Sequence, residues 1–158
     1  MAELRVGTPE ETAFLEELES AELLIPSGVP GLYGRGSVFE DVRTAIEDLV
    51  TRHAVDDAPE TLRFPPVLPR RTLEDTGYLR SFPHLGASIF GFEGSERDAL
   101  ELAERADAHE DWSGLQGQTD LVLTPAACYP VYPAIARRGT LPPGGVAVDA
   151  GGAYVFRN

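Results

Sequence analysis

Apolar and polar positions near the start of the chain alternate with the period of a helix. Residues 8–24 open with Thr8, Pro9 and Glu11, the pattern of a capping box with proline at the first helical position. Apolar residues then recur at helical spacing, so this stretch is predicted to be a short amphipathic helix. The next stretch, IPSGVPGLYGRG (25–36), contains two prolines and four glycines, and it is predicted to be a loop.

A second and longer helix is predicted over residues 37–53. Ser37 and Glu40 form another capping-box pattern at its start. The apolar residues that follow fall on one helical face: Phe39, Val42, Ile46, Leu49 and Val50. Such a face must be covered by other apolar surface, either in the core of a monomer or between two chains.

The rest of the chain changes between the two-residue period of strands and the longer period of helices. TLRFPPVLP (61–69) contains paired prolines, which favour an edge strand or an extended segment. Further along, Ser95 and Asp98 cap a predicted helix. The remaining predictions are a short helix within 70–80 that ends at Gly77, a turn over 81–84, strands over 87–92 and 120–123, helices over 95–109 and 131–138, and a β-hairpin over 144–157 that turns at DAGG.

The order of these elements predicts the fold class. Helices and strands are mixed without strict βαβ alternation, which favours an α+β domain with an antiparallel or mixed sheet and helices on one side. At 158 residues the chain fits one domain. We expect residues 1–36, a helix and a loop, to fold together with a core formed by residues 37–158.

Charge and composition narrow the classes of function. The net charge is −13, which opposes broad attraction to nucleic acid. The sequence has no lysine, which excludes a phosphate-loop lysine and a Schiff-base lysine. Two arginine pairs, Arg70–Arg71 with Arg80 nearby and Arg137–Arg138, are either contacts for an acidic partner or solvated helix ends. No apolar run is long enough to span a bilayer and no signal-peptide pattern is present, so we expect a cytoplasmic protein.

The stretch DLVLTPAACYPVYP (120–133) holds the only cysteine of the sequence, Cys128, directly after a predicted buried strand. A single cysteine forms no internal disulfide, which fits a reducing compartment. By residue type alone, Cys128 is a small packed side chain, a metal ligand or a reactive thiol.

Four stretches of the chain together resemble a known family. LIPSGVPGLYGR, LRFPPV, GYLRSFPHL and LTPAACYPVYP are similar to the pattern of the amino acid:[carrier protein] ligases, seryl-tRNA synthetase homologues in the class II aminoacyl-tRNA synthetase superfamily. The resemblance implies a class II synthetase-like sheet flanked by helices. It also implies that Phe39–Pro69 corresponds to motif 1, which forms the dimer interface in the class. We therefore expect a homodimer through residues 38–69.

The same resemblance implies two site residues. Tyr154–Arg157 is similar to the strand of motif 2, whose arginine contacts the α-phosphate of ATP; Arg157 is therefore the expected catalytic and ATP-binding residue, with Mg²⁺ accompanying the nucleotide. Cys128 stands where synthetases of this type place the glutamate that accepts the substrate ammonium. In the ligases this cysteine holds a zinc ion together with a glutamate and a second cysteine, so Cys128 is the expected metal ligand.

The resemblance to the family pattern extends to the end of the sequence. The chain stops at FRN, whereas the family reads FR-x-E and continues into the remaining zinc ligands and motif 3. The expected sheet is therefore incomplete at its C-terminal side. One arginine is expected to hold ATP weakly, and one protein ligand does not hold a catalytic zinc ion.

Three functions remain open on these grounds. The first is ATP-dependent activation of a small amino acid and its transfer to the phosphopantetheine thiol of an acyl or peptidyl carrier protein. The net charge and the absence of a coiled-coil arm disfavour tRNA as the acceptor. The second is a shortened, non-catalytic paralogue that acts as a dimerisation or carrier-protein-binding module. The third is another small-molecule reaction in the remnant pocket.

Overall fold

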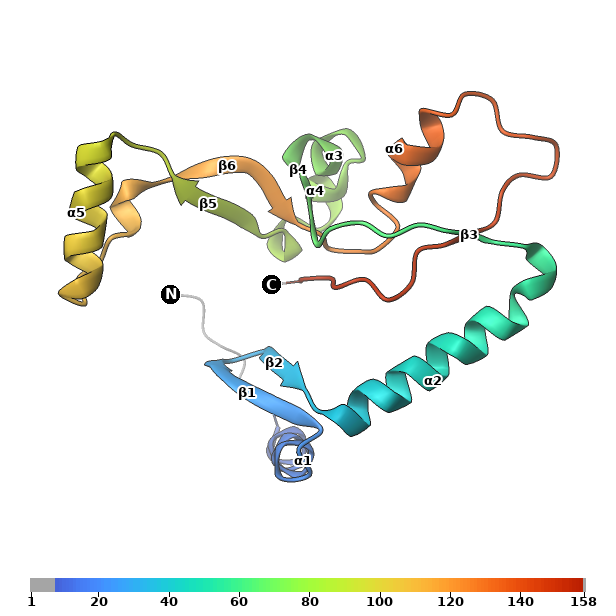
Figure 1. The fold of residues 1–158 in the computed structure, drawn as a ribbon, viewed down its shortest axis with the longest axis horizontal. Coiled ribbons are helices and arrows are strands. Elements are labelled where there is room, and N and C mark those ends of the chain that lie inside the picture. The colour runs from blue at the N-terminus through green and yellow to red at the C-terminus, as the bar shows by residue number, and fades with distance from the viewer. Residues whose placement is uncertain (1–7, 158) are drawn as a thin grey trace. The chain divides into compact units, whose positions relative to one another are not determined.

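The computed structural model describes residues 8–157. Residues 1–7 of the predicted segment 1–36 and Asn158 of the predicted core 37–158 lie outside the described residues. The chain forms two compact units that divide between Asp57 and Ala58, and each unit is described by itself (Figure 1). Both units combine helices with short strands, so the α+β prediction is confirmed. The expectation of one domain divided after residue 36 stays a prediction. Within residues 8–157, no helix is both long and apolar enough to cross a membrane.

The N-terminal unit begins with α1 (Pro9–Ser20), and its capping box forms as the sequence predicts. The backbone N–H of Thr8 donates to Glu11 Oε2 at 2.7 Å, and the backbone N–H of Glu11 donates to Thr8 Oγ1 at 3.3 Å. These bonds satisfy donors that the first helical turn leaves without a partner. The helix ends at Ser20, four residues before the predicted end at residue 24.

The loop predicted over residues 25–36 is instead a β-hairpin. β1 (Leu24–Val29) pairs antiparallel with β2 (Leu32–Arg35), and the sequence Pro30–Gly31 connects them. Gly31 has a φ of 81°, which glycine adopts without steric cost. The prediction of a loop is wrong, because proline and glycine are also tolerated in the edge strands of a hairpin. In a two-stranded sheet both strands are edges, where proline is tolerated, and Pro26 pairs with Tyr33 there.

Helix α2 (Ser37–His53) has the predicted length, but its predicted capping box does not form. Gly36 is the N-cap residue, and no side chain caps the helix. The Glu40 carboxylate lies 2.6 Å from the Arg35 guanidinium, so it pairs with a charged group and not with the backbone of Ser37. Charge-assisted hydrogen bonds are roughly twice as strong as neutral ones, which explains this choice.

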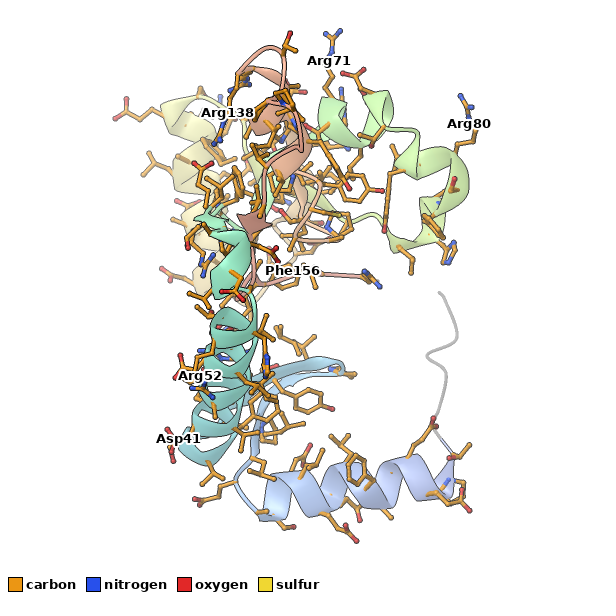
Figure 2. All side chains as sticks on the ribbon, turned by 90° about the vertical axis from the view of Figure 1, so that its right-hand side faces the viewer. Asp41, Arg52, Arg71, Arg80, Arg138 and Phe156 are labelled. Atoms are coloured by element: carbon orange, nitrogen blue, oxygen red, sulfur yellow. The ribbon has the colours of Figure 1, made fainter. Side chains whose placement is uncertain are left out.

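The apolar stripe of α2 has no cover within its own unit. The helix contains no buried residue. Its exposed apolar side chains are Val38 (58%), Val42 (55%), Ile46 (56%), Leu49 (47%) and Val50 (62%). Asp41 and Arg52 are among the polar residues of the same helix (Figure 2). An apolar stripe as long as the helix marks a surface that another apolar surface covers.

The C-terminal unit is built on a three-stranded antiparallel sheet. Its strands are β4 (Val67–Pro69), β6 (Gln116–Leu123) and β5 (Ser88–Phe92), and β6 lies between the other two. The chain passes from β5 to β6 through α5 (Glu96–Asp107), which follows β5 at the end remote from β4 (Figure 1). The predicted capping box at the start of α5 is formed.

The core of this unit lies where two short helices cover the sheet. The predicted end of a helix at Gly77 is seen, because α3 (Arg70–Asp75) stops just before Gly77, whose φ is 71°; a further short helix, α4 (Tyr78–Ser81), follows it. The buried apolar residues are Leu68, Leu73, Tyr78 and Val122, with Leu85 and Tyr129 packed against them. The short 3₁₀ helices η2 (Pro83–Leu85) and η3 (Ser113–Leu115) belong to this unit, whereas η1 (Val55–Asp57) ends the N-terminal unit. The rings of Tyr78 and Tyr129 meet edge to face at 5.2 Å, and this contact holds the loop after β6 against α4.

The β-hairpin predicted over 144–157 is wrong. β7 (Val148–Asp149) pairs in parallel with β3 (Glu60–Thr61), and the residues that follow DAGG form no strand. Asp149 Oδ1 accepts a hydrogen bond from the backbone N–H of Gly151 at 2.8 Å. The aspartate therefore closes a local side-chain turn at the position where the hairpin was expected to reverse.

Two ion pairs flank the β3–β7 pairing, one between β3 and the residue that follows α6 and its C-cap, the other between the segment after β3 and β7. The Arg138 guanidinium donates two hydrogen bonds to the Glu60 carboxylate. The Arg63 guanidinium donates to the backbone oxygen of Asp149 at 3.0 Å and to its carboxylate at 3.2 Å. Each pair joins residues about eighty positions apart, which no local sequence pattern indicates.

The β3–β7 pairing is expected to weaken in acid. Hydrogen bonds from Arg138 hold the pKa of Glu60 below its usual value, and the Gly151 N–H followed by Arg63 lowers the pKa of Asp149. A carboxylate with a lowered folded-state pKa adds stability above its unfolded pKa and loses it as the pH falls through the folded value, here below about pH 4. The carboxyl carbon shift of Glu60, followed by NMR, is expected to titrate at higher pH in Arg138→Met. An unchanged titration midpoint of Glu60 in that variant would contradict the ion pair between Glu60 and Arg138.

Candidate functional site

The loop after β6 carries Cys128 into an open hollow. β6 ends at Leu123, residues 124–130 form the loop, and α6 (Val131–Ala136) follows, two residues shorter than predicted. The Cys128 side chain is exposed. The hollow has a volume of about 290 Å³ and is lined by Ala127, Cys128, Val131, Tyr132, Val148, Ala150 and Gly151. None of these lining residues is acidic, so the wall itself offers no ion pair to an ammonium group.

The last described residues run back beside this loop. The backbone N–H of Phe156 donates to the carbonyl of Thr124 at 2.8 Å, and Arg157 Nε donates to the carbonyl of Pro125 at 2.9 Å. Arg157 and Cys128 are therefore both attached to one short loop. Arg157 is not among the residues that line the Cys128 hollow. The structure thus brings the two predicted site residues to one loop but not into one cavity.

The surroundings of Cys128 do not form a metal site. Within residues 8–157, no three histidine, cysteine, aspartate or glutamate side chains lie close enough together to hold a metal ion. A catalytic zinc ion ordinarily has about three protein ligands. The described residues therefore do not fit the zinc ion that the resemblance implies, and Cys128 as its ligand stays a prediction.

Tyr129, the neighbour of Cys128, does not supply a base. Burial raises the pKa of Tyr129, and the adjacent Cys128 adds a smaller contribution in the same direction. The phenol therefore keeps its proton at neutral pH. Because its ring packs edge-on against Tyr78, Tyr129 has a structural role that positions the loop.

A second and smaller cavity borders the same loop. Its volume is about 70 Å³, and it shares Ala127 and Ala150 with the Cys128 hollow. Thr124 lines it, is only 2% exposed, and has a buried Oγ1 without a hydrogen-bond partner among the described residues. A buried hydroxyl without a partner costs about 1–3 kcal/mol. Sequence analysis missed Thr124, although a polar residue between a buried strand and a proline was a visible signal.

Replacing Thr124 with valine is expected to stabilise the C-terminal unit by about 1 kcal/mol, because valine keeps the shape and removes the unpaired hydroxyl. Thermal unfolding followed by circular dichroism measures the change. Thr119→Val is the matched control, since Thr119 Oγ1 donates to the Ile89 carbonyl at 2.9 Å and accepts from the Leu121 N–H at 3.2 Å. That variant is expected to lose stability. A lower melting temperature for Thr124→Val would mean that its hydroxyl has a partner in solution.

Comparison with known proteins gives two relatives and no matching family model. The chain is 45% identical over 122 residues to amino acid–[acyl-carrier-protein] ligase 1 of Bradyrhizobium diazoefficiens. The matched residues make up 77% of this chain and 37% of the relative. It is 42% identical over 143 residues to ligase 2 of the same organism, which covers 90% of this chain and 42% of the relative. The chain thus spans about two fifths of the length of these relatives. Identity at this level over most of its own length shows that the chain belongs to the family of the amino acid–[acyl-carrier-protein] ligases.

Proposed function

We propose that this chain supplies part of a site at which ATP activates a small amino acid for transfer to a carrier protein. The supporting observation is the identity of 42–45% to two proteins named as such ligases. In this chemistry a carboxylate oxygen attacks the α-phosphorus of ATP and pyrophosphate leaves. The thiol of the carrier then attacks the carbonyl carbon of the adenylate, loses its proton, and releases AMP.

Arg157 is the residue proposed to bind the α-phosphate. Its Nε is engaged with the Pro125 carbonyl, which fixes the plane of the guanidinium. No other hydrogen bond within residues 8–157 involves this group, so its terminal nitrogens are available. A guanidinium held in this way binds two phosphate oxygens at once and stabilises the charge that develops on them.

The amino acid is proposed to bind at the open hollow beside Cys128. Gly151, which lines the hollow, is six positions before Arg157, and Arg157 bonds to Pro125 in the same loop as Cys128. Both relations support a shared site. A zinc ion there would polarise the amino group, but the described residues provide only Cys128 for it. ATP with Mg²⁺ is the proposed cofactor, and Cys128 as a zinc ligand would need partners beyond the described residues.

Exchange of radiolabelled pyrophosphate into ATP tests this proposal. The chain is expected to catalyse exchange in the presence of a small amino acid, and Arg157→Ala is expected to lose at least about tenfold of the rate. Arg97→Ala is the matched control, because Arg97 is an exposed arginine on α5. Equal exchange in all three proteins would remove Arg157 from the site. No exchange in the wild-type chain would remove the proposed catalysis.

A second function is favoured by the uncovered stripe of α2. A chain that dimerises through residues 38–69 and binds a carrier protein without catalysis would use this surface. The two functions share the homodimer and the carrier protein, and the acidic net charge disfavours tRNA for both. They differ in pyrophosphate exchange, which only the enzyme performs.

A further inference from the structure

Charge is separated within the C-terminal unit. Eight of the thirteen acidic residues of residues 58–158 lie between positions 93 and 111, on α5 and the segments beside it. Between positions 121 and 148 the sequence has no acidic residue. Residues 70–85, which form α3, α4 and η2, carry three arginines against two acidic residues. The net positive charge of this unit therefore lies in two stretches, residues 70–85, which cover β4 and β6, and residues 121–148 with Arg137 and Arg138.

Two arginines of α3 and α4 extend into solvent. Figure 2 shows the side chains of Arg71 and Arg80 pointing outward from these helices. Arg71 is 83% exposed and lies 3.4 Å from Asp75, one helical turn away, a surface pair that contributes little. The Arg80 guanidinium makes no hydrogen bond or ion pair within residues 8–157. Both groups are therefore available to a partner with negative charge.

Exposed apolar side chains accompany these arginines. Leu79 is 38% exposed and Phe82 is 47% exposed. The rings of Phe82 and Tyr78 lie 5.5 Å apart, and Tyr78 is buried in the core, so Phe82 is held in place before any partner binds. Arginine and aromatic residues together are enriched at protein interfaces. We call Arg71, Leu79, Arg80 and Phe82 the arginine surface.

We propose that the arginine surface is the docking site for an acidic patch of the carrier protein. The carrier as partner rests on the proposed function, whereas the acidic character of its patch follows from the two available guanidinium groups. The contact between Tyr78 and Tyr129 joins α4 to the loop of Cys128, so docking on α4 brings the carrier to the loop that holds the site. The net charge of −13 disfavours an acidic partner over the molecule as a whole, so the attraction requires a local group of arginines such as this one.

The test compares two variants with the same net charge. Arg71→Glu/Arg80→Glu reverses the arginine surface. Arg52→Glu/Arg97→Glu is the matched control, because both of these arginines are exposed and neither makes an ion pair within the described part of the chain. The probe is a fluorescently labelled acyl carrier protein from Bradyrhizobium diazoefficiens, and anisotropy measures its Kd at low and at moderate salt. Circular dichroism checks folding, and Arg71→Ala/Arg80→Ala replaces the first variant if the reversal unfolds the unit.

The surface variant is expected to weaken carrier binding at least about tenfold and to reduce its salt dependence, while the control stays within about threefold of wild type. Unchanged binding in the surface variant would overturn the docking site and leave the carrier as partner. Equal weakening in both variants would also overturn it, because net charge alone would then explain the effect. If the wild-type chain binds tRNA and not the carrier, the docking proposal and the proposed acceptor both fall, whereas pyrophosphate exchange still reports on amino acid activation.

Discussion

Replacing Ile46 with glutamate is expected to abolish self-association of the chain. Ile46 lies in the middle of the apolar stripe of α2 and is 56% exposed. In a two-fold symmetric dimer the stripe of each copy faces the other, so one substitution removes two apolar contacts and buries two charges. Each apolar side chain contributes about 1.5–3 kcal/mol, so the dimer Kd is expected to rise roughly a thousandfold. Light scattering and sedimentation equilibrium measure the change.

Thr44→Glu is the matched control for this prediction. Thr44 is exposed and falls on the polar face of α2, with Asp41 and Arg52 (Figure 2). The same charge added there leaves the stripe intact, so the dimer is expected to persist. A wild-type chain that is monomeric at micromolar concentration would show that the stripe has another cover. Dissociation of both variants would show that added charge, and not the stripe, is responsible.

The sequence predicts local structure best where a side chain bonds to its own helix. The capping boxes at Thr8 and at Ser95 form as expected, because donor and acceptor are three residues apart and neither Glu11 nor Asp98 is in an ion pair with another described residue. The box expected at Ser37 fails because Glu40 pairs with Arg35 across the end of β2. The same local signal therefore succeeds or fails according to the charged groups that folding brings near it.

Long-range pairing is the part that local patterns do not reveal. Alternation over 144–157 predicts a hairpin, but β7 pairs with β3, and the Arg63 guanidinium beside β3 bonds to Asp149 of β7. In contrast, the strands over 87–92 and 120–123 are confirmed as β5 and part of β6, which pair antiparallel with each other.

The candidate site also combines features that the sequence indicates with features that appear only in the folded structure. The family resemblance, more than the position after a strand, indicates Cys128 as a site residue, and the structure places it on an exposed loop beside an open hollow. The family resemblance alone singled out Arg157, which reaches that loop through one hydrogen bond to Pro125. Thr124 follows a predicted strand in the sequence, but its cavity is formed by three segments that meet only in the folded unit, so no spacing in the sequence indicates the cavity.

Replacing Leu73 with alanine is expected to unfold much of the C-terminal unit. Leu73 is 0% exposed and lies on α3, where it packs with Leu68, Tyr78 and Val122. Removal of a fully buried leucine side chain costs about 2.7–5 kcal/mol, because burial is lost and a cavity remains. A whole domain is stabilised by only about 5–15 kcal/mol, and these four residues are the buried apolar cluster of the described unit. Urea denaturation followed by circular dichroism measures the loss.

Leu100→Ala is the matched control for this prediction, because it makes the same substitution at an exposed leucine. Leu100 lies on α5 and is 65% exposed, so the same substitution there removes little buried surface. It is expected to change the free energy of unfolding by less than about 0.5 kcal/mol, since alanine also favours the helix. A core centred on Leu73 requires a large difference between the two variants. Equal midpoints in urea would mean that the sheet with α3 and α4 does not carry the stability of the unit, and that the arginine surface and the Cys128 loop rest on another core.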